Sequence, residues 1–184
     1  MKSTPQTDTQ SVYQHGESVS NYMVDLLEHL ENGRPLQYEW KIPEWVYNYK
    51  ELLLSKLPDR ETLLLYTLYH DSGKPFCIEY DEQGRKHFPN HAEVSYQTFR
   101  KYFNNDLAAD LVRRDMDFHL LKTDKLEEFS ESDNCTTLML SALAEIHSNA
   151  AMFGGIDSVS FKIKWKHTNK RGRQVLELIT KNNK

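Results

Sequence analysis

The sequence predicts a mainly helical bundle with a small β element at its C-terminal end. Apolar residues recur at spacings of three and four along most of the chain up to residue 153, which is the period of one helix face. Beyond residue 158 the spacing changes to two, which indicates a strand. Hydrophobic residues make up 39% and charged residues 27% of the 184 residues, a balance typical of a folded globular chain. No apolar run approaches the ~18 residues of a membrane helix.

Several helices are predicted in the first part of the chain. Residues 1–10 are polar and are expected to form a flexible tail. Residues 11–30 predict a first helix, with a clear apolar stripe from residue 19 onward and His15 early in it, and a Gly- and Pro-containing segment ends it. A second helix is expected over 45–57. A third begins after Asp59, a plausible cap for the apolar run 63–69.

The middle of the chain continues this helical pattern. Residues 81–84, Asp-Glu-Gln-Gly, predict a turn. Helical spacing resumes over 91–103 and again over 105–121, where Asn105 and Asp106 supply a cap. The polar stretch 122–134 is expected to be a loop or a short helix, and 136–153 is strongly helical.

The C-terminal part is basic and changes period. Apolar and polar side chains alternate over 159–166, which predicts a strand, and 169–172 predicts a turn. We therefore expect a domain over 11–155 and a basic strand or hairpin appendage over 156–184. Its lysines and Trp165 fit a nucleic-acid surface, and equally fit a charged edge strand that resists aggregation.

Charge and cysteine usage limit the function classes. The net charge of −4 excludes a chain coated for bulk nucleic-acid binding. Cys77 and Cys135 are far apart and lack Cys-x-x-Cys spacing, so free thiols in a reducing compartment are expected. Because residues 1–10 also lack an apolar signal core, we expect a cytoplasmic location.

The chemistry is expected at His70 and Asp71, which end an apolar helix. Two ionisable side chains at the inner end of such a helix are costly unless they are used. Neutral imidazole and carboxylate suit Mn, Fe, Co, Ni, Zn and, less well, Mg. Further candidate ligands are spread along the chain: His15, His91, Asp115, Asp117, His119 and Glu145.

Two of these candidates have their own arguments. Asp115 and His119 are four residues apart and would share one helix face. Asp117 and His119 compete with Asp115 for a ligand role. Glu145 interrupts an apolar helix, where an unpaired carboxylate is costly.

Three segments together resemble the HD phosphohydrolase superfamily. They are His-Asp-Ser-Gly-Lys-Pro at 70–75, the Gly turn at 81–85 and His-Phe-Pro-Asn-His at 87–91. Their order is most similar to the HD domains of CCA-adding tRNA nucleotidyltransferases and of RNA end-healing polynucleotide kinase fusions. The resemblance covers 11–153 and implies an HD-type helical bundle.

The resemblance also implies roles for individual residues. His15 matches the first ligand histidine, and His70 with Asp71 matches the signature pair. Lys74 matches the lysine that faces substrate phosphate. His91 matches a histidine that serves a second metal or a phosphate. Arg113 and Arg114 are further candidates for binding substrate phosphate, and the catalytic residues would be Asp71, Lys74 and His91.

Two positions depart from the family pattern. Asp115 stands where a histidine is usual, and Glu145 stands where an aspartate is usual. A carboxylate can serve at either position with a different reach. The departures leave open whether one or two divalent ions bind, and which of Mn, Mg, Co, Ni or Zn.

The implied activity is that of a metal-dependent phosphohydrolase, a phosphodiesterase or phosphatase. The favoured substrate is a nucleotidyl phosphate, namely a 2′,3′-cyclic or terminal phosphate on RNA, with no membrane partner. A nucleotidase or a cyclic (oligo)nucleotide phosphodiesterase is one alternative. A degenerate nucleotide-binding module is another, favoured by the departures at Asp115 and Glu145. The enzyme could act alone or beside a separately encoded kinase or ligase, and its oligomeric state is open.

Overall fold

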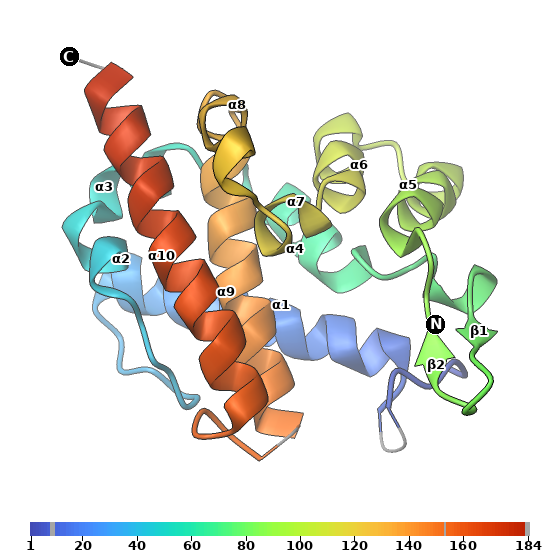
Figure 1. Cartoon of the computed structure of the whole chain (residues 1–184). Helices are drawn as coiled ribbons and strands as arrows, with labels where there is room; N and C mark the ends of the chain where they lie inside the picture. The colour runs from blue at the N-terminus through green and yellow to red at the C-terminus, as the bar shows by residue number, and fades with distance from the viewer. Residues whose placement is uncertain (8–9, 153, 183–184) are drawn as a thin grey trace. The chain divides into compact units, whose positions relative to one another are not determined.

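The computed structural model describes residues 1–7, 10–152 and 154–182. The chain divides into two compact units. Unit 1 comprises Met1–Ser20 and Asp59–Met116, and unit 2 comprises Asn21–Pro58 and Asp117–Lys184. Nearly all of the ordered elements are helices, as the sequence predicts (Figure 1).

Helix α1 (Val12–Asn32) contains His15 in its first turn, as the sequence predicts. The Ser11 hydroxyl accepts a hydrogen bond from the Gln14 amide at 3.2 Å, and Gln14 Oε1 accepts one from the Ser11 amide at 2.9 Å. This reciprocal pair is a capping box, which satisfies two amides at the helix start.

Unit 1 contains α4 (Arg60–Tyr69), the short 3-10 helix η1 (Lys74–Phe76), α5 (His91–Tyr102) and α6 (Asp106–Arg113). Within this unit α6 packs against both α4 and α5. Both predicted caps are confirmed. Asp59 accepts a hydrogen bond from the Thr62 amide, and Asn105 accepts one from the Ala108 amide. The core includes Leu63, Tyr66, Phe99, Leu111 and Val112, all buried.

A small hairpin lies between η1 and α5. Strands β1 (Glu79–Tyr80) and β2 (Lys86–His87) pair antiparallel, with Glu79 opposite His87 and Tyr80 opposite Lys86. The predicted turn is confirmed, and Gly84 adopts a φ of 74° within it. That left-handed conformation favours glycine.

Unit 2 contains the remaining elements. They are α2 (Glu44–Asn48), α3 (Lys50–Ser55), α7 (Met116–His119, whose first residue belongs to unit 1), η2 (Thr123–Lys125), α8 (Leu126–Ser130), α9 (Cys135–Met152) and α10 (Val159–Asn182). The long helix α10 packs against α9, α8 and α2, and Figure 1 shows it beside α9 in red and orange. The predicted helix over 45–57 divides at Tyr49, whose φ of −118° and ψ of 23° are not helical.

The predicted C-terminal strand is wrong, because residues 159–182 form α10. The buried side of this helix carries Phe161, Thr168, Gly172, Val175, Leu176 and Ile179, at helical spacings. Two residues of the apparent alternation, Val159 and Ile163, are 75% and 66% exposed. The predicted turn at 169–172 is also wrong. Gly172 lies inside the helix, where a Cβ would overlap the Trp45 indole.

A second correction concerns the helix predicted over 105–121. Helix α6 ends at Arg113, and Arg114 leaves the helical conformation with φ −97° and ψ 6°. The short α7 starts at Met116, so Asp115 lies between the two helices. Asp115 and His119 therefore do not share one continuous helix face, contrary to the expectation.

Several predictions fall at the edges of the described residues. The helix expected over 136–153 is α9, and Phe153 lies outside the described residues. Residues 8 and 9 of the predicted tail lie outside them as well. Elsewhere in the predicted tail, the Pro5 carbonyl oxygen accepts a hydrogen bond from Lys86 Nζ at 2.9 Å.

Both cysteines are free thiols, as expected. The described residues hold no helix that is long and apolar enough to cross a membrane.

Candidate metal centre

The close approach of α1 to α4 within unit 1 positions the first histidine. A Cβ at Gly16 would overlap the carbonyl oxygen of Leu68, so only glycine permits this approach. Farther along the same contact, the hydroxyls of Ser20 and Thr67 are hydrogen-bonded at 2.8 Å. The neighbouring side chain, His15, is thereby buried against the end of α4.

The end of α4 positions the signature pair. His70 Nδ1 donates to the Thr67 carbonyl oxygen at 2.8 Å. A neutral ring then carries its lone pair on Nε2, and it is Nε2 that lies 3.3 Å from Asp71 Oδ2. A backbone carbonyl that fixes the tautomer in this way is typical of histidines that ligate metals.

A second close approach supports the loop that follows the pair. Gly73 packs so tightly against α5 that a Cβ would overlap the Ser95 amide nitrogen. The Gly73 amide donates to Ser95 Oγ at 2.8 Å, and Ser72 Oγ donates to the Ser95 carbonyl oxygen at 3.3 Å. These buried contacts hold the segment between Asp71 and Lys74 in place.

Asp71 lies at the centre of a buried cluster. Its Oδ2 is 2.6 Å from Lys74 Nζ and 3.5 Å from His15 Nε2, in addition to its contact with His70. Its Oδ1 is 3.8 Å from His91 Nε2. All five predicted residues of this cluster therefore lie together in unit 1.

The electrostatics of the cluster favour an ionised Asp71. Burial alone would raise the pKa of this carboxyl group. The charge of Lys74 and, when their rings are protonated, the charges of His70 and His15 outweigh burial, so the pKa of Asp71 lies well below its usual range. An ionised carboxylate is the form that binds a cation.

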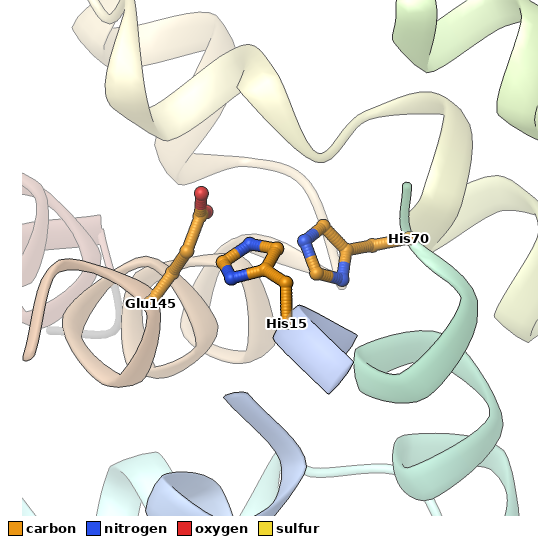
Figure 2. Close-up of side chains that lie close together, drawn as sticks. All are labelled: His15, His70 and Glu145. Atoms are coloured by element: carbon orange, nitrogen blue, oxygen red, sulfur yellow. The ribbon is translucent and has the colours of Figure 1, made fainter. Parts of the chain in front are cut away.

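The donor set fits a divalent metal ion. Figure 2 shows the rings of His15 and His70 side by side; it also draws Glu145, which belongs to unit 2. The two rings meet edge to face with centroids 5.2 Å apart, and a ring nitrogen of each lies within 4.8 Å of the other. Two imidazoles and a carboxylate in one buried cluster suit Mn, Fe, Co, Ni or Zn.

Lys74 and His91 border the cluster. Lys74 is buried, donates to Gln6 Oε1 at 3.3 Å and places its ammonium 5.2 Å from the centroid of the Phe88 ring. His91 is partly exposed, and its Nδ1 donates to the Phe88 carbonyl oxygen at 3.1 Å. Both side chains can therefore present a donor or cation beside Asp71.

Asp115 is hydrogen-bonded to a tyrosine of α4. It is buried in unit 1, and its Oδ1 accepts a hydrogen bond from the Tyr66 hydroxyl at 2.7 Å. Tyr66 was not predicted as a site residue. The sequence of an apolar helix does not indicate which group a tyrosine hydroxyl within it will contact. The ligand role of Asp115 stays a prediction.

Glu145 belongs to unit 2, where it lies on α9. Its Oε2 accepts a hydrogen bond from His119 Nε2 at 2.8 Å, so the predicted competitor of Asp115 is paired with a different carboxylate. Nearby His147 is structural. Its Nδ1 donates to the Leu143 carbonyl oxygen at 2.7 Å and its Nε2 accepts from the Lys41 amide at 3.0 Å.

The two predicted phosphate-binding arginines are partnered by acidic residues. Arg113 donates from Nε to Glu93 at 2.8 Å and packs over the Tyr96 ring. Arg114 Nη1 lies 4.0 Å from Asp110. Their roles in binding substrate stay predictions.

Comparison with known protein families matches residues 12–150 to the HD domain. The chain belongs to the HD-domain family. The match covers the buried cluster and most of α9, and the helical fold agrees with it. Comparison with curated proteins and with solved structures gave no significant match.

HD domains are generally metal-dependent phosphohydrolases, and this defines the broad chemistry of the site. His70, Asp71 and Lys74 are adjacent or nearly so in the sequence and lie together in the structure, and their roles stay predictions. Sequence reasoning missed the supporting groups Gly16, Ser95 and Tyr66. A glycine within a helical pattern, as at Gly16, is the signal that could have indicated a close helix contact.

Proposed function

We propose that this HD domain hydrolyses a nucleotidyl phosphate, and that the substrate is a 2′,3′-cyclic or terminal phosphate on RNA. One observation supports the hydrolase proposal most. Asp71 is buried in contact with two imidazoles, an ammonium group and a third, partly exposed imidazole. The RNA substrate rests on the resemblance of the motif order to RNA-processing HD domains.

The proposed ligands of the first cation are His15, His70, Asp71 and Glu145. His91 and Asp115 are proposed for a second cation. The argument for Glu145 comes from its own unit. It is a carboxylate between buried neighbours, Ala144 and Ile146, and it is already oriented by His119.

The residues around Asp71 have distinct proposed roles. A bound divalent cation supplies Lewis acidity and lowers the pKa of water to ~7. Lys74 and His91 would donate to phosphate oxygens and stabilise the charge that develops on them. Because the pKa of Asp71 is well below its usual range, its carboxylate is a weak base. It is therefore better suited to hold a cation than to accept a proton.

The test combines metal binding with turnover. Purified protein is titrated with Mn²⁺, Mg²⁺, Co²⁺, Ni²⁺ and Zn²⁺ in a calorimeter. Each metal form is then incubated with RNA ending in a 2′,3′-cyclic phosphate and with RNA ending in a 3′-phosphate. We expect metal-dependent ring opening or phosphate release by the wild type, and loss of both binding and turnover in His70→Ala.

A matched control separates loss of function from misfolding. His29 lies on the same helix as His15 but about 21 Å farther along its axis, so His29→Ala should bind metal and turn over like the wild type. Turnover of nucleoside monophosphates or cyclic dinucleotides in place of RNA would replace the RNA proposal by a nucleotide one. Absence of metal binding with every cation, with His70→Ala unchanged, would overturn the enzymatic proposal.

A further inference from the structure

The β1–β2 hairpin forms a groove that the proposed mechanism does not use. We call it the hairpin groove. Its volume is about 380 Å³, and its lining residues are Glu79, Tyr80, Asp81, His87, Phe88 and Pro89. The volume falls in the range of small-molecule sites, roughly 300–1,000 Å³.

Phe88 joins this groove to the Asp71 cluster within unit 1. Phe88 lines the groove, and its ring centroid lies 5.2 Å from Lys74 Nζ. Its carbonyl oxygen holds His91 Nδ1. A ligand whose phosphate reached Lys74 and His91 would therefore have its other end at the groove.

The hairpin is held in shape before any ligand binds. The Asp81 carboxylate accepts hydrogen bonds from the amides of Gln83 and Arg85, from Arg85 Nε at 2.7 Å and from His87 Nε2 at 3.1 Å. Lys86 Nζ ties the second strand to Pro5. A wall that is already ordered binds a ligand at lower entropic cost.

The groove presents an aromatic ring to solvent. Tyr80 is 63% exposed, although its neighbours hold the strand in place. Burial of such a ring by the fold would be favourable, and its exposure leaves a flat apolar face available for stacking.

The groove and the Asp71 cluster differ in charge. Glu79 and Asp81 both line it, whereas the ammonium of Lys74 lies at the Phe88 end. A neutral base is better suited than a phosphate to the end that carries Glu79, and a phosphate is attracted to the ammonium of Lys74. This separation of charge gives a bound molecule one orientation.

We propose that the hairpin groove is a nucleobase subsite, in which the base of a nucleoside phosphate stacks on Tyr80 while its phosphate lies beside Lys74. The orientation rests on the proposed function, because it takes the Asp71 cluster as the phosphate site. The subsite would contribute affinity without base-specific contacts, because every base has a face that can stack.

The test compares two ligands that differ only in the base. Adenosine 5′-monophosphate and ribose 5-phosphate carry the same sugar and phosphate, so the ratio of their dissociation constants measures the contribution of the base. Both are measured by equilibrium dialysis in EDTA, where no turnover occurs. We expect the wild type to bind the nucleotide about 10-fold more tightly than the sugar phosphate.

The variants assign that ratio to one side chain. Tyr80→Ala should bring the ratio close to one, and Tyr80→Phe should preserve it. Tyr102 is a control of the same type in the same unit. It is 75% exposed at the end of α5 and does not line the groove, so Tyr102→Ala should keep the wild-type ratio.

Two results would overturn the subsite. The wild type could bind both ligands equally or neither, or Tyr80→Ala could retain the wild-type ratio. Failure of the hydrolase proposal is separate, because the dialysis needs neither metal nor turnover. If the wild type keeps the expected ratio of dissociation constants but hydrolyses nothing, the protein is a nucleotide-binding domain. If it hydrolyses RNA ends but the ratio is one, it is an enzyme without this subsite.

Discussion

The buried charge pair of Asp71 and Lys74 links stability to the candidate site. We expect Asp71→Asn to abolish metal binding and to destabilise unit 1 by about 3 kcal/mol, because the Lys74 ammonium loses its partner 2.6 Å away. The pKa of Asp71 is depressed in the folded state, so its contribution is present above the unfolded value of about 3.9 and is lost as pH falls through the folded pKa. Urea unfolding at pH 7 measures the effect.

The double variant Asp71→Asn with Lys74→Met provides the check on this reasoning. Removing the ammonium as well should recover part of the lost stability, whereas metal binding should stay absent. If Asp71→Asn alone were as stable as the wild type, the buried pair would not contribute as described.

His147 makes a second prediction at the residue scale. Burial lowers its pKa to about 4, and the hydrogen bond from its Nδ1 to the Leu143 carbonyl oxygen, which raises the pKa, offsets only part of that shift. The unfolded state takes up the proton near pH 6.5 and the folded state does so only near pH 4. Protonation between these values favours unfolding, so this contribution to stability is complete above pH 6.5 and falls as pH decreases, by about 1.4 kcal/mol per pH unit.

The variant His147→Gln removes this titration. It should be less stable than the wild type at pH 7.5, and the difference should shrink as the pH approaches 5. Urea midpoints at pH 7.5, 6 and 5 give the comparison. A difference that stays constant over this range would contradict a pKa of about 4 for His147.

Residues close together in sequence were the predictable part of the site. His70, Asp71 and Lys74 lie within one turn after α4, so local chain geometry brings them together wherever the helix ends. The pairing of His119 with Glu145 joins positions 26 residues apart and depends on packing. Sequence spacing carries no information of that kind without a family motif.

At the scale of elements, the contact of α1 with α4 depends on one glycine. Gly16→Ala should destabilise the protein by about 1–3 kcal/mol, because the added methyl group would overlap the Leu68 carbonyl oxygen and backbone cannot move as a side chain can. Metal affinity should fall in parallel, since His15 would move away from His70. Thermal unfolding and calorimetric metal titration measure the two effects.

The neighbouring residue supplies the control. Glu17 is exposed on α1, so Glu17→Ala should change stability and metal binding little. A Gly16→Ala variant with the stability and metal affinity of the wild type would show that α1 does not need to approach α4 this closely.

The elements also explain where sequence reasoning was misled. The alternation over 159–166 has the two-residue period of a strand. Phe161, Trp165 and Thr168, however, recur at the spacings of four and three that mark one face of a helix. The decisive information is the apolar face that continues through Val175 and Ile179 and packs in unit 2. A short window at the start of a long amphipathic helix does not contain that information, whereas the caps at Asp59 and Asn105 are local and were predictable.

At the scale of the whole molecule, metal binding should appear as stability. A cation that binds only the folded chain stabilises it by about 2.7 kcal/mol at a concentration 100 times its dissociation constant. His15, His70 and Asp71 all belong to unit 1, so Mn²⁺ should raise the unfolding free energy of that unit in the wild type and not in His15→Ala or His70→Ala. Amide hydrogen exchange measured at increasing urea concentrations gives the unfolding free energy of each unit separately.

The same experiment tests the proposed ligand from the other unit. If Glu145 binds the cation, Mn²⁺ should also slow amide exchange in α9, and Glu145→Gln should remove that protection. Glu127 on α8 is an exposed glutamate of unit 2, so Glu127→Gln should respond to Mn²⁺ like the wild type. Protection of unit 1 alone, unchanged by Glu145→Gln, would limit the protein ligands to unit 1 and remove Glu145 from the centre. A stable cation site would then need water or substrate oxygens in its place, because two histidines and one aspartate leave coordination positions open.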